Sequence, residues 1–173
     1  MIHLRKTLAG VSLLLLVACA QEQQIDASLA STLSVSSVTA VTSVSREETA
    51  VPKAEIVEAA RGRVAQTLRA ANARGTMPVV VELNITSFYI ANPIAGVLLG
   101  GSQSNIVAEV KVLDAATGAV VTDSFRVVGA TEPRPTILGA AAIKAPKEEL
   151  SIITSDLARN IAIAVYGNTA SGA

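Results

Sequence analysis

The chain has 173 residues and equal numbers of basic and acidic residues, 14 of each. A length of this order suits one domain and is short for two. A balanced charge lacks the positive surface that nucleic-acid binding needs, so we expect no nucleic-acid partner. Aromatic residues make up 2% of the chain, and it has no tryptophan, which disfavours binding of sugars or single strands by ring stacking. The core must therefore be built from valine, isoleucine, leucine and alanine.

A short basic head and an apolar run open the sequence. Arg5 and Lys6 come first, and residues 13–18 are all apolar. Polar residues follow at 21–24, whereas a membrane-spanning helix needs roughly 20 apolar residues in succession. This plan is typical of an export signal. We predict that residues 1–18 form a signal peptide that is removed, which leaves 12 basic against 14 acidic residues.

The end of this segment carries the most specific motif in the chain. Leu16, Val17 and Ala18 precede Cys19, and this order resembles the lipobox of bacterial lipoproteins. The resemblance implies that the Cys19 thiol receives diacylglycerol, that cleavage occurs just before it, and that a fatty acid such as palmitate often acylates the new amine. Two or more acyl chains hold a protein firmly on a bilayer, whereas one binds only marginally. The alternative is an ordinary signal peptide with a cysteine at its end by chance.

The residue after Cys19 bears on the compartment. Residue 20 is alanine, whereas an aspartate in this place tends to retain Gram-negative lipoproteins in the inner membrane. The resemblance therefore implies the outer membrane, with the protein facing the periplasm, where the host has two membranes. Cys19 is the only cysteine, so its lipidation would leave no thiol for a disulfide.

Residues 19–30 are predicted to be a lipidated tether, residues 31–167 a single α/β domain and residues 168–173 a flexible tail. The domain begins with a strand at 31–44, where valine, serine and threonine prevail. Pro52 opens a helix, because the first turn of a helix leaves its N–H groups unused. Gly75 ends this helix. Its apolar stripe consists of Ile56, Val57, Ala60, Val64, Leu68 and Ala71.

Three strands are predicted next, at 78–90, 104–113 and 119–128, from the alternation of apolar and polar residues. The phase of the first strand changes near Thr86 and Ser87, which indicates a β-bulge. Between the second and third strands, the segment from Asp114 to Gly118 predicts a tight hairpin connection.

A last helix is predicted from Pro146 to Gly167, with Glu148 and Glu149 favouring its positive end. Its core stripe consists of Leu150, Ile153, Leu157, Ile161 and Ala164. The order of elements is thus β-α-β-β-β-α. We predict an α+β fold, a two-layer sandwich in which two helices cover one face of a mostly antiparallel four-stranded sheet.

The middle of the chain resembles known families. The segment from Pro78 to Val121 combines a strand, a glycine-rich loop from Gly96 to Gly101, and a hairpin of Asp-Ala-Ala-Thr-Gly type. It resembles several families of uncharacterised bacterial lipoproteins and is more distantly similar to auxiliary lipoproteins of cell-envelope transporters. Those families carry no agreed catalytic residues, so the resemblance implies none.

The residues available for chemistry are few. His3 leaves with the signal, and no free thiol remains, which excludes Ser-His-Asp and Cys-His mechanisms and the usual zinc sites. The pairs Glu47-Glu48 and Glu148-Glu149 are adjacent in sequence, so their members point in different directions and are expected to be solvated. We therefore expect no enzymatic activity, no cofactor and no metal.

Two apolar features are candidates for binding. On the last helix, Ile152 and Ile163 lie opposite the core stripe, beside Arg159 and Tyr166, and form a candidate surface for a protein partner or a membrane. The loops at 94–99 and 137–143 form a second candidate, with Ile94, Val97, Leu98 and Leu99 in the first. The alternative is that the loops fold over the second sheet face and the isoleucines are isolated.

These features predict a non-enzymatic lipoprotein of the cell envelope, an adaptor or assembly component that contacts an envelope protein. The alternative is a periplasmic binding module for a lipid or another apolar ligand, with the two apolar loops as its mouth. A closed apolar cavity would favour the binding module, and a flat exposed patch would favour the adaptor.

Overall fold

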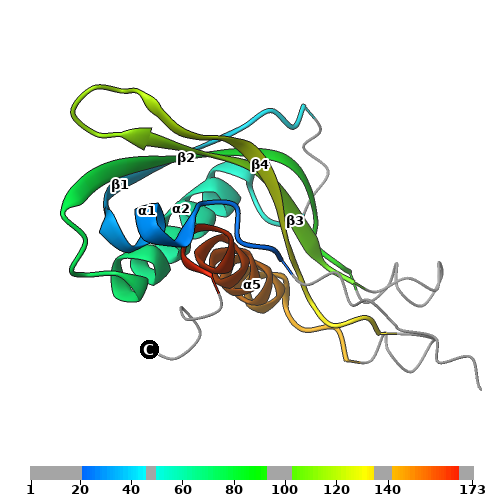
Figure 1. Cartoon of the computed structure of the whole chain (residues 1–173). Helices are drawn as coiled ribbons and strands as arrows, with labels where there is room; N and C mark the ends of the chain where they lie inside the picture. The colour runs from blue at the N-terminus through cyan, green and yellow to red at the C-terminus, as the bar shows by residue number, and fades with distance from the viewer. Residues whose placement is uncertain (1–20, 46–49, 93–102, 135–141, 168–173) are drawn as a thin grey trace, which may run out of the picture.

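The computed structural model describes residues 21–45, 50–92, 103–134 and 142–167. It is a two-layer α+β sandwich in which helices lie along one face of a four-stranded sheet (Figure 1). The predicted signal segment, Cys19, the Glu47-Glu48 pair, the glycine-rich loop and the predicted tail lie outside the described residues. The elements in chain order are α1 (Ala27–Thr32), β1 (Leu33–Thr42), α2 (Lys53–Ala71), β2 (Met77–Tyr89), β3 (Asn105–Asp114), β4 (Val120–Ala130) and α5 (Pro146–Tyr166).

The sheet has the strand order β1-β2-β3-β4. The β1–β2 pair is parallel and is joined by α2, whereas the other two pairs are antiparallel. The predicted mostly antiparallel sheet is therefore confirmed, with one parallel pair at its edge. The register between β2 and β3 shifts between Ile85 and Ser87, where the change of phase predicted a bulge.

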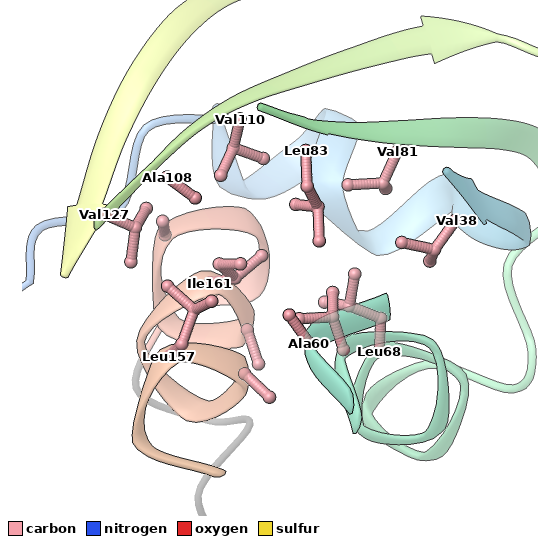
Figure 2. Close-up of a cluster of buried hydrophobic side chains, with 14 of the residues drawn as sticks. Val38, Ala60, Leu68, Val81, Leu83, Ala108, Val110, Val127, Leu157 and Ile161 are labelled. Atoms are coloured by element: carbon pink, nitrogen blue, oxygen red, sulfur yellow. The ribbon is translucent and has the colours of Figure 1, made fainter. Parts of the chain in front are cut away.

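The core lies between the sheet and the two long helices. Alternate residues of the central strands point toward the helices, as the period of two requires, and they are buried in the middle of each strand, whereas Met77 and Phe88 near the ends of β2 are half-buried. Figure 2 shows Leu83 and Val110 from the sheet above Ala60, Leu68, Leu157 and Ile161 from the helices. Both predicted stripes are found in this core, except that Val57 and Ala71 at the margin of α2 are only half-buried.

The predicted tether is wrong at its C-terminal end, because the domain begins before residue 31. The Asp26 side chain accepts a hydrogen bond from the Ser28 N–H at 2.9 Å and caps α1. Ile25 and Ala30 are 4% and 2% exposed, and the Gln24 N–H donates to the carbonyl of Ala164 at 2.7 Å. Residues 24–32 therefore close one end of the sandwich against the last turn of α5.

The β3–β4 hairpin forms as the sequence predicts. The Asp114 carboxylate accepts hydrogen bonds from the N–H groups of Ala116 and Thr117 at 3.0 and 2.7 Å and from the Thr117 hydroxyl. These bonds, that of the Thr117 hydroxyl first, hold the pKa of Asp114 below its usual value. Gly118 has φ +71°, a left-handed conformation that glycine adopts without strain.

Candidate functional site

A shallow groove lies between α5 and the end of β4, and we call it the α5 groove. Its volume is about 460 Å³, and it is open to solvent. Its lining residues are Ala130, Glu132, Ser151, Ile152, Ser155, Asp156 and Arg159. The groove thus combines an apolar side chain with both signs of charge.

Tight contact between β4 and α5 shapes this groove. A Cβ atom added at Gly129 would lie 2.6 Å from the Leu157 Cβ and would overlap the carbonyl oxygen of Ile153, so the crossing requires glycine. Two side chains of α5 also satisfy outward-facing backbone groups of β4. Asp156 accepts from the Ala130 N–H at 2.9 Å, and Asn160 donates to the Val128 carbonyl at 2.8 Å. These bonds cover one end of an edge strand that would otherwise be open to pairing.

The four residues predicted as a partner surface divide into two pairs. Ile152 and Arg159 both line the α5 groove, where Arg159 is in an ion pair with Asp156. Ile163 and Tyr166 follow on the same helix and do not line the groove. Both isoleucines are half-buried, so the exposed apolar area is smaller than the sequence predicts. Tyr166 packs against the core, and burial raises its pKa to about 12.

A buried polar cluster lies at the N-terminal end of α5. The Glu149 side chain is 0% exposed and accepts a hydrogen bond from the Ser104 hydroxyl at 2.6 Å. Its other oxygen lies 2.9 Å from a guanidinium nitrogen of Arg134 and accepts from the Lys144 N–H at 3.0 Å. The prediction of two solvated carboxylates is therefore wrong for Glu149. It holds for Glu148, which is half-exposed and in an ion pair with Lys144.

This cluster joins the chain segments that flank the two apolar loops. The Ser104 hydroxyl, just after residues 93–102, accepts from the Ala91 N–H just before them at 2.9 Å. Arg134 and Lys144 flank residues 135–141 in the same way. Ala91 also packs against Ile143 in a small apolar cluster of its own. The bases of both loops are thus held side by side, although Ile94, Val97, Leu98 and Leu99 lie outside the described residues.

One signal for the buried carboxylate was present in the sequence. Glu149 stands four residues before Ile153, so it falls within the core stripe of the last helix. A carboxylate on such a stripe requires a buried partner, because an unpaired charge in a core is very unfavourable. The sequence does not say which of its basic residues that partner is.

Two classes of site are not found among the described residues. Within them, no three acidic, histidine or cysteine side chains come together as a metal ion would need. Over the same ranges, each helix is too short or too polar to cross a bilayer.

Comparison with known proteins gives distant likenesses only. No family model matches the chain, and no curated protein matches its sequence. A proposed lipoprotein of Caulobacter crescentus CB15 is 14% identical with a TM-score of 0.43, over 79% of this chain and 92% of that one.

Two further solved structures have a similar degree of likeness. A single-site variant of the PelC dodecamer from Paraburkholderia phytofirmans is 16% identical with a TM-score of 0.41, over 83% and 91% of the chains. A Xanthomonas campestris protein of the family DUF330 is 14% identical with a TM-score of 0.42, over 76% and 84%. At these values the likenesses assign no function to this chain.

Proposed function

We propose that this chain is a non-enzymatic lipoprotein of the cell envelope, anchored in the outer membrane through Cys19, that contacts a protein partner through the α5 groove. The observation that carries the proposal is the composition of that groove. Ile152 supplies apolar area, and Arg159, Asp156 and Glu132 surround it with charge. An apolar centre with a polar rim is the usual plan of a protein–protein interface.

The absence of enzymatic chemistry is part of the proposal and rests on the sequence. Once residues 1–18 are removed, the chain retains no histidine, and its single cysteine carries the lipid. Glu149, the buried carboxylate, is engaged by Ser104, Arg134 and the Lys144 backbone, so it serves to hold chain segments together.

A second candidate function, binding of a lipid or another apolar ligand, is favoured by the buried cluster. The four chain segments that lead into residues 93–102 and 135–141 meet around Glu149. Two apolar loops that start side by side are what a shared mouth for such a ligand requires.

The anchor is tested by metabolic labelling with an alkyne analogue of palmitate. Wild-type chains are expected to incorporate the label and to sediment with outer-membrane vesicles. The Cys19→Ser variant is expected to lose both properties and to keep its signal segment. Unlabelled wild-type chains with unchanged processing of Cys19→Ser would refute the anchor.

The partner is tested with matched isoleucine variants. A photo-crosslinking residue at position 155 in the α5 groove is used in intact cells to identify the bound protein. Ile152→Ser and Arg159→Glu are expected to reduce capture of that protein, whereas Ile163→Ser, on the same helix but outside the groove, leaves it unchanged. Equal capture by all variants at unchanged thermal stability would remove the α5 groove from the proposal.

A further inference from the structure

The sheet face opposite the helices, which we call the open face, carries the most exposed large hydrophobic side chains among the described residues. Figure 1 shows the helices on the other side of the sheet only. The large hydrophobic residues that are most exposed among those described are Val41 at 62%, Val120 at 53%, Tyr89 at 43% and Val128 at 38%. The strand register places all four on the open face, opposite Asn84, Leu113, Asn105 and Val107.

Charged side chains occupy the centre of the open face. Glu109 and Lys111 lie on β3, with Arg126 opposite Glu109 on β4 and Glu82 opposite Lys111 on β2. Glu109 accepts a hydrogen bond from the Ser124 hydroxyl at 3.2 Å. Within the described ranges, none of these four charged groups is in an ion pair, although two pairs stand directly opposite one another. A hollow of about 450 Å³, lined by Glu82, Glu109 and Lys111 among others, lies over this centre.

The outward residues of β3 form a self-complementary row. In chain order they are Val107, which is only 7% exposed, and then Glu109, Lys111 and Leu113, that is apolar, acidic, basic and apolar. In one arrangement, two sheets pack face to face and are related by a two-fold axis that lies between them and runs perpendicular to β3. This axis reverses the row in the second copy. Each glutamate then faces a lysine, and each Leu113 faces the other apolar end of the row, where Val128 on β4 is the exposed neighbour of the buried Val107. An isologous interface makes every such contact twice.

We propose that two copies of this chain pair through their open faces, with Lys111 of each copy against Glu109 of the other. Val120 is then covered at one end of the charged centre and Val128 and Tyr89 at the other, whereas Val41 is covered beside the centre itself. A membrane or a nucleic acid fits this face less well, because both prefer a surface of one positive sign. The open face carries two acidic side chains, Glu82 and Glu109, and two basic ones, Lys111 and Arg126. This neutral balance suits a surface that pairs with a second copy of itself.

The size of the face is sufficient. Four strands at about 4.8 Å spacing and about ten residues at 3.3 Å give a footprint of roughly 600 Å² per copy. The two copies together then bury about 1,200 Å², the lower end of the range for specific interfaces. Facing sheets commonly pack with their strands within about 30° of one another, which keeps β3 over β3.

Charge exchange between copies tests this pairing. Full-length chains with two different epitope tags after residue 173 are expressed together, extracted in detergent and captured through one tag. Wild-type copies are expected to co-purify. Lys111→Glu and Glu109→Lys are each expected to reduce co-purification with themselves by about tenfold or more, because like charges then meet twice. Arg61→Glu, an exposed charge change on α2, serves as the matched control and leaves co-purification unchanged.

The decisive measurement combines the two single variants. A Lys111→Glu copy and a Glu109→Lys copy are complementary, so they are expected to co-purify with each other as the wild type does. The neutral variants Lys111→Gln and Glu109→Gln weaken pairing and do not rescue one another, which separates charge pairing from misfolding. The proposal would be overturned if the wild type were monomeric or if the charge variants co-purified as well as the wild type. It would also be overturned if the mixed pair co-purified no better than each single variant does with itself.

Discussion

Two polar clusters, each built on a carboxylate, lie near the two ends of β3 and differ in burial and in how far away in sequence their partners are. At its C-terminal end, the Asp114 carboxylate is exposed and binds groups no more than three residues away. Before its N-terminal end, Ser104 is fully buried and binds Glu149, 45 residues away. One cluster shapes a turn in water, and the other joins distant segments inside the protein.

The two clusters differ in whether water can replace a lost hydrogen-bond partner. Solvent can satisfy an exposed carboxylate that loses a partner, so an exposed turn tolerates change. A buried charge whose partner is removed has no such substitute, and breaking a buried pair costs about 3–5 kcal/mol. Substitutions at the two clusters should therefore differ in effect, and each of the following experiments tests that contrast.

The largest effect is expected for Glu149→Gln. The substitution keeps the size of the side chain but removes the charge that faces Arg134, whose side chain is 13% exposed. We expect the free energy of unfolding to fall by about 3–5 kcal/mol, measured by urea denaturation. The double variant Glu149→Leu with Arg134→Met should recover part of the loss, because it leaves no unpaired charge. A loss below about 1 kcal/mol would mean that the pair is solvated in solution.

Ser104→Ala is expected to have the next largest effect. It removes the hydroxyl that donates to Glu149 and accepts from the Ala91 N–H, and it leaves both groups buried. The expected loss is about 1–3 kcal/mol, measured in the same way. Ser155→Ala, on the exposed side of α5, is the control and should change stability little. Equal losses for the two variants would contradict the assigned role of burial.

At the turn, Gly118→Ala is expected to cost about 1–2 kcal/mol, because the backbone at φ +71° is strained for alanine. Gly62→Ala in α2 is the matched control. An added Cβ at Gly62 meets no atom within 4 Å, so this change should stabilise the helix by about 0.5–1 kcal/mol. Thermal unfolding of both variants should show opposite signs, and equal signs would contradict the assigned turn.

The smallest effect is expected from the ionisation of Asp114. Its pKa is lower in the folded protein than the ordinary value of 3.8, so its charged form contributes stability above that value. This contribution is lost as the pH falls through the folded pKa. The stability difference between wild type and Asp114→Ala should therefore narrow below pH 3.8, as measured by denaturation across pH. A difference that is constant with pH would exclude this contribution.

The same contrast explains which features the sequence could predict. Gly118, the bulge near Thr86 and the stripes of both long helices depend on neighbours within a few residues, and they are found as predicted apart from Val57 and Ala71 at the margin of α2. Ile152 and Arg159 also share one groove, since seven residues are about two helical turns.

What the sequence could not predict depends on contacts between distant segments. The partners of Glu149 come from the segments just before β3, just after β4 and just before α5, and Asp156 meets β4 only because Gly129 permits a close crossing. The sequence does not predict the short helix α1, because the stability of this helix comes from packing against α5 and not from its own six residues.

The hydrogen bond between Gln24 and Ala164 limits how far position 19 can lie from the domain. Gln24 is the fifth residue after position 19, and a fully extended chain gains at most about 3.5 Å per residue. Any group borne by the sulfur at position 19 must therefore stay within about 20 Å of the last turn of α5. If that group is a set of acyl chains, the link between the bilayer and the domain is shorter than the domain itself. The domain can then bind only partners that lie next to the bilayer.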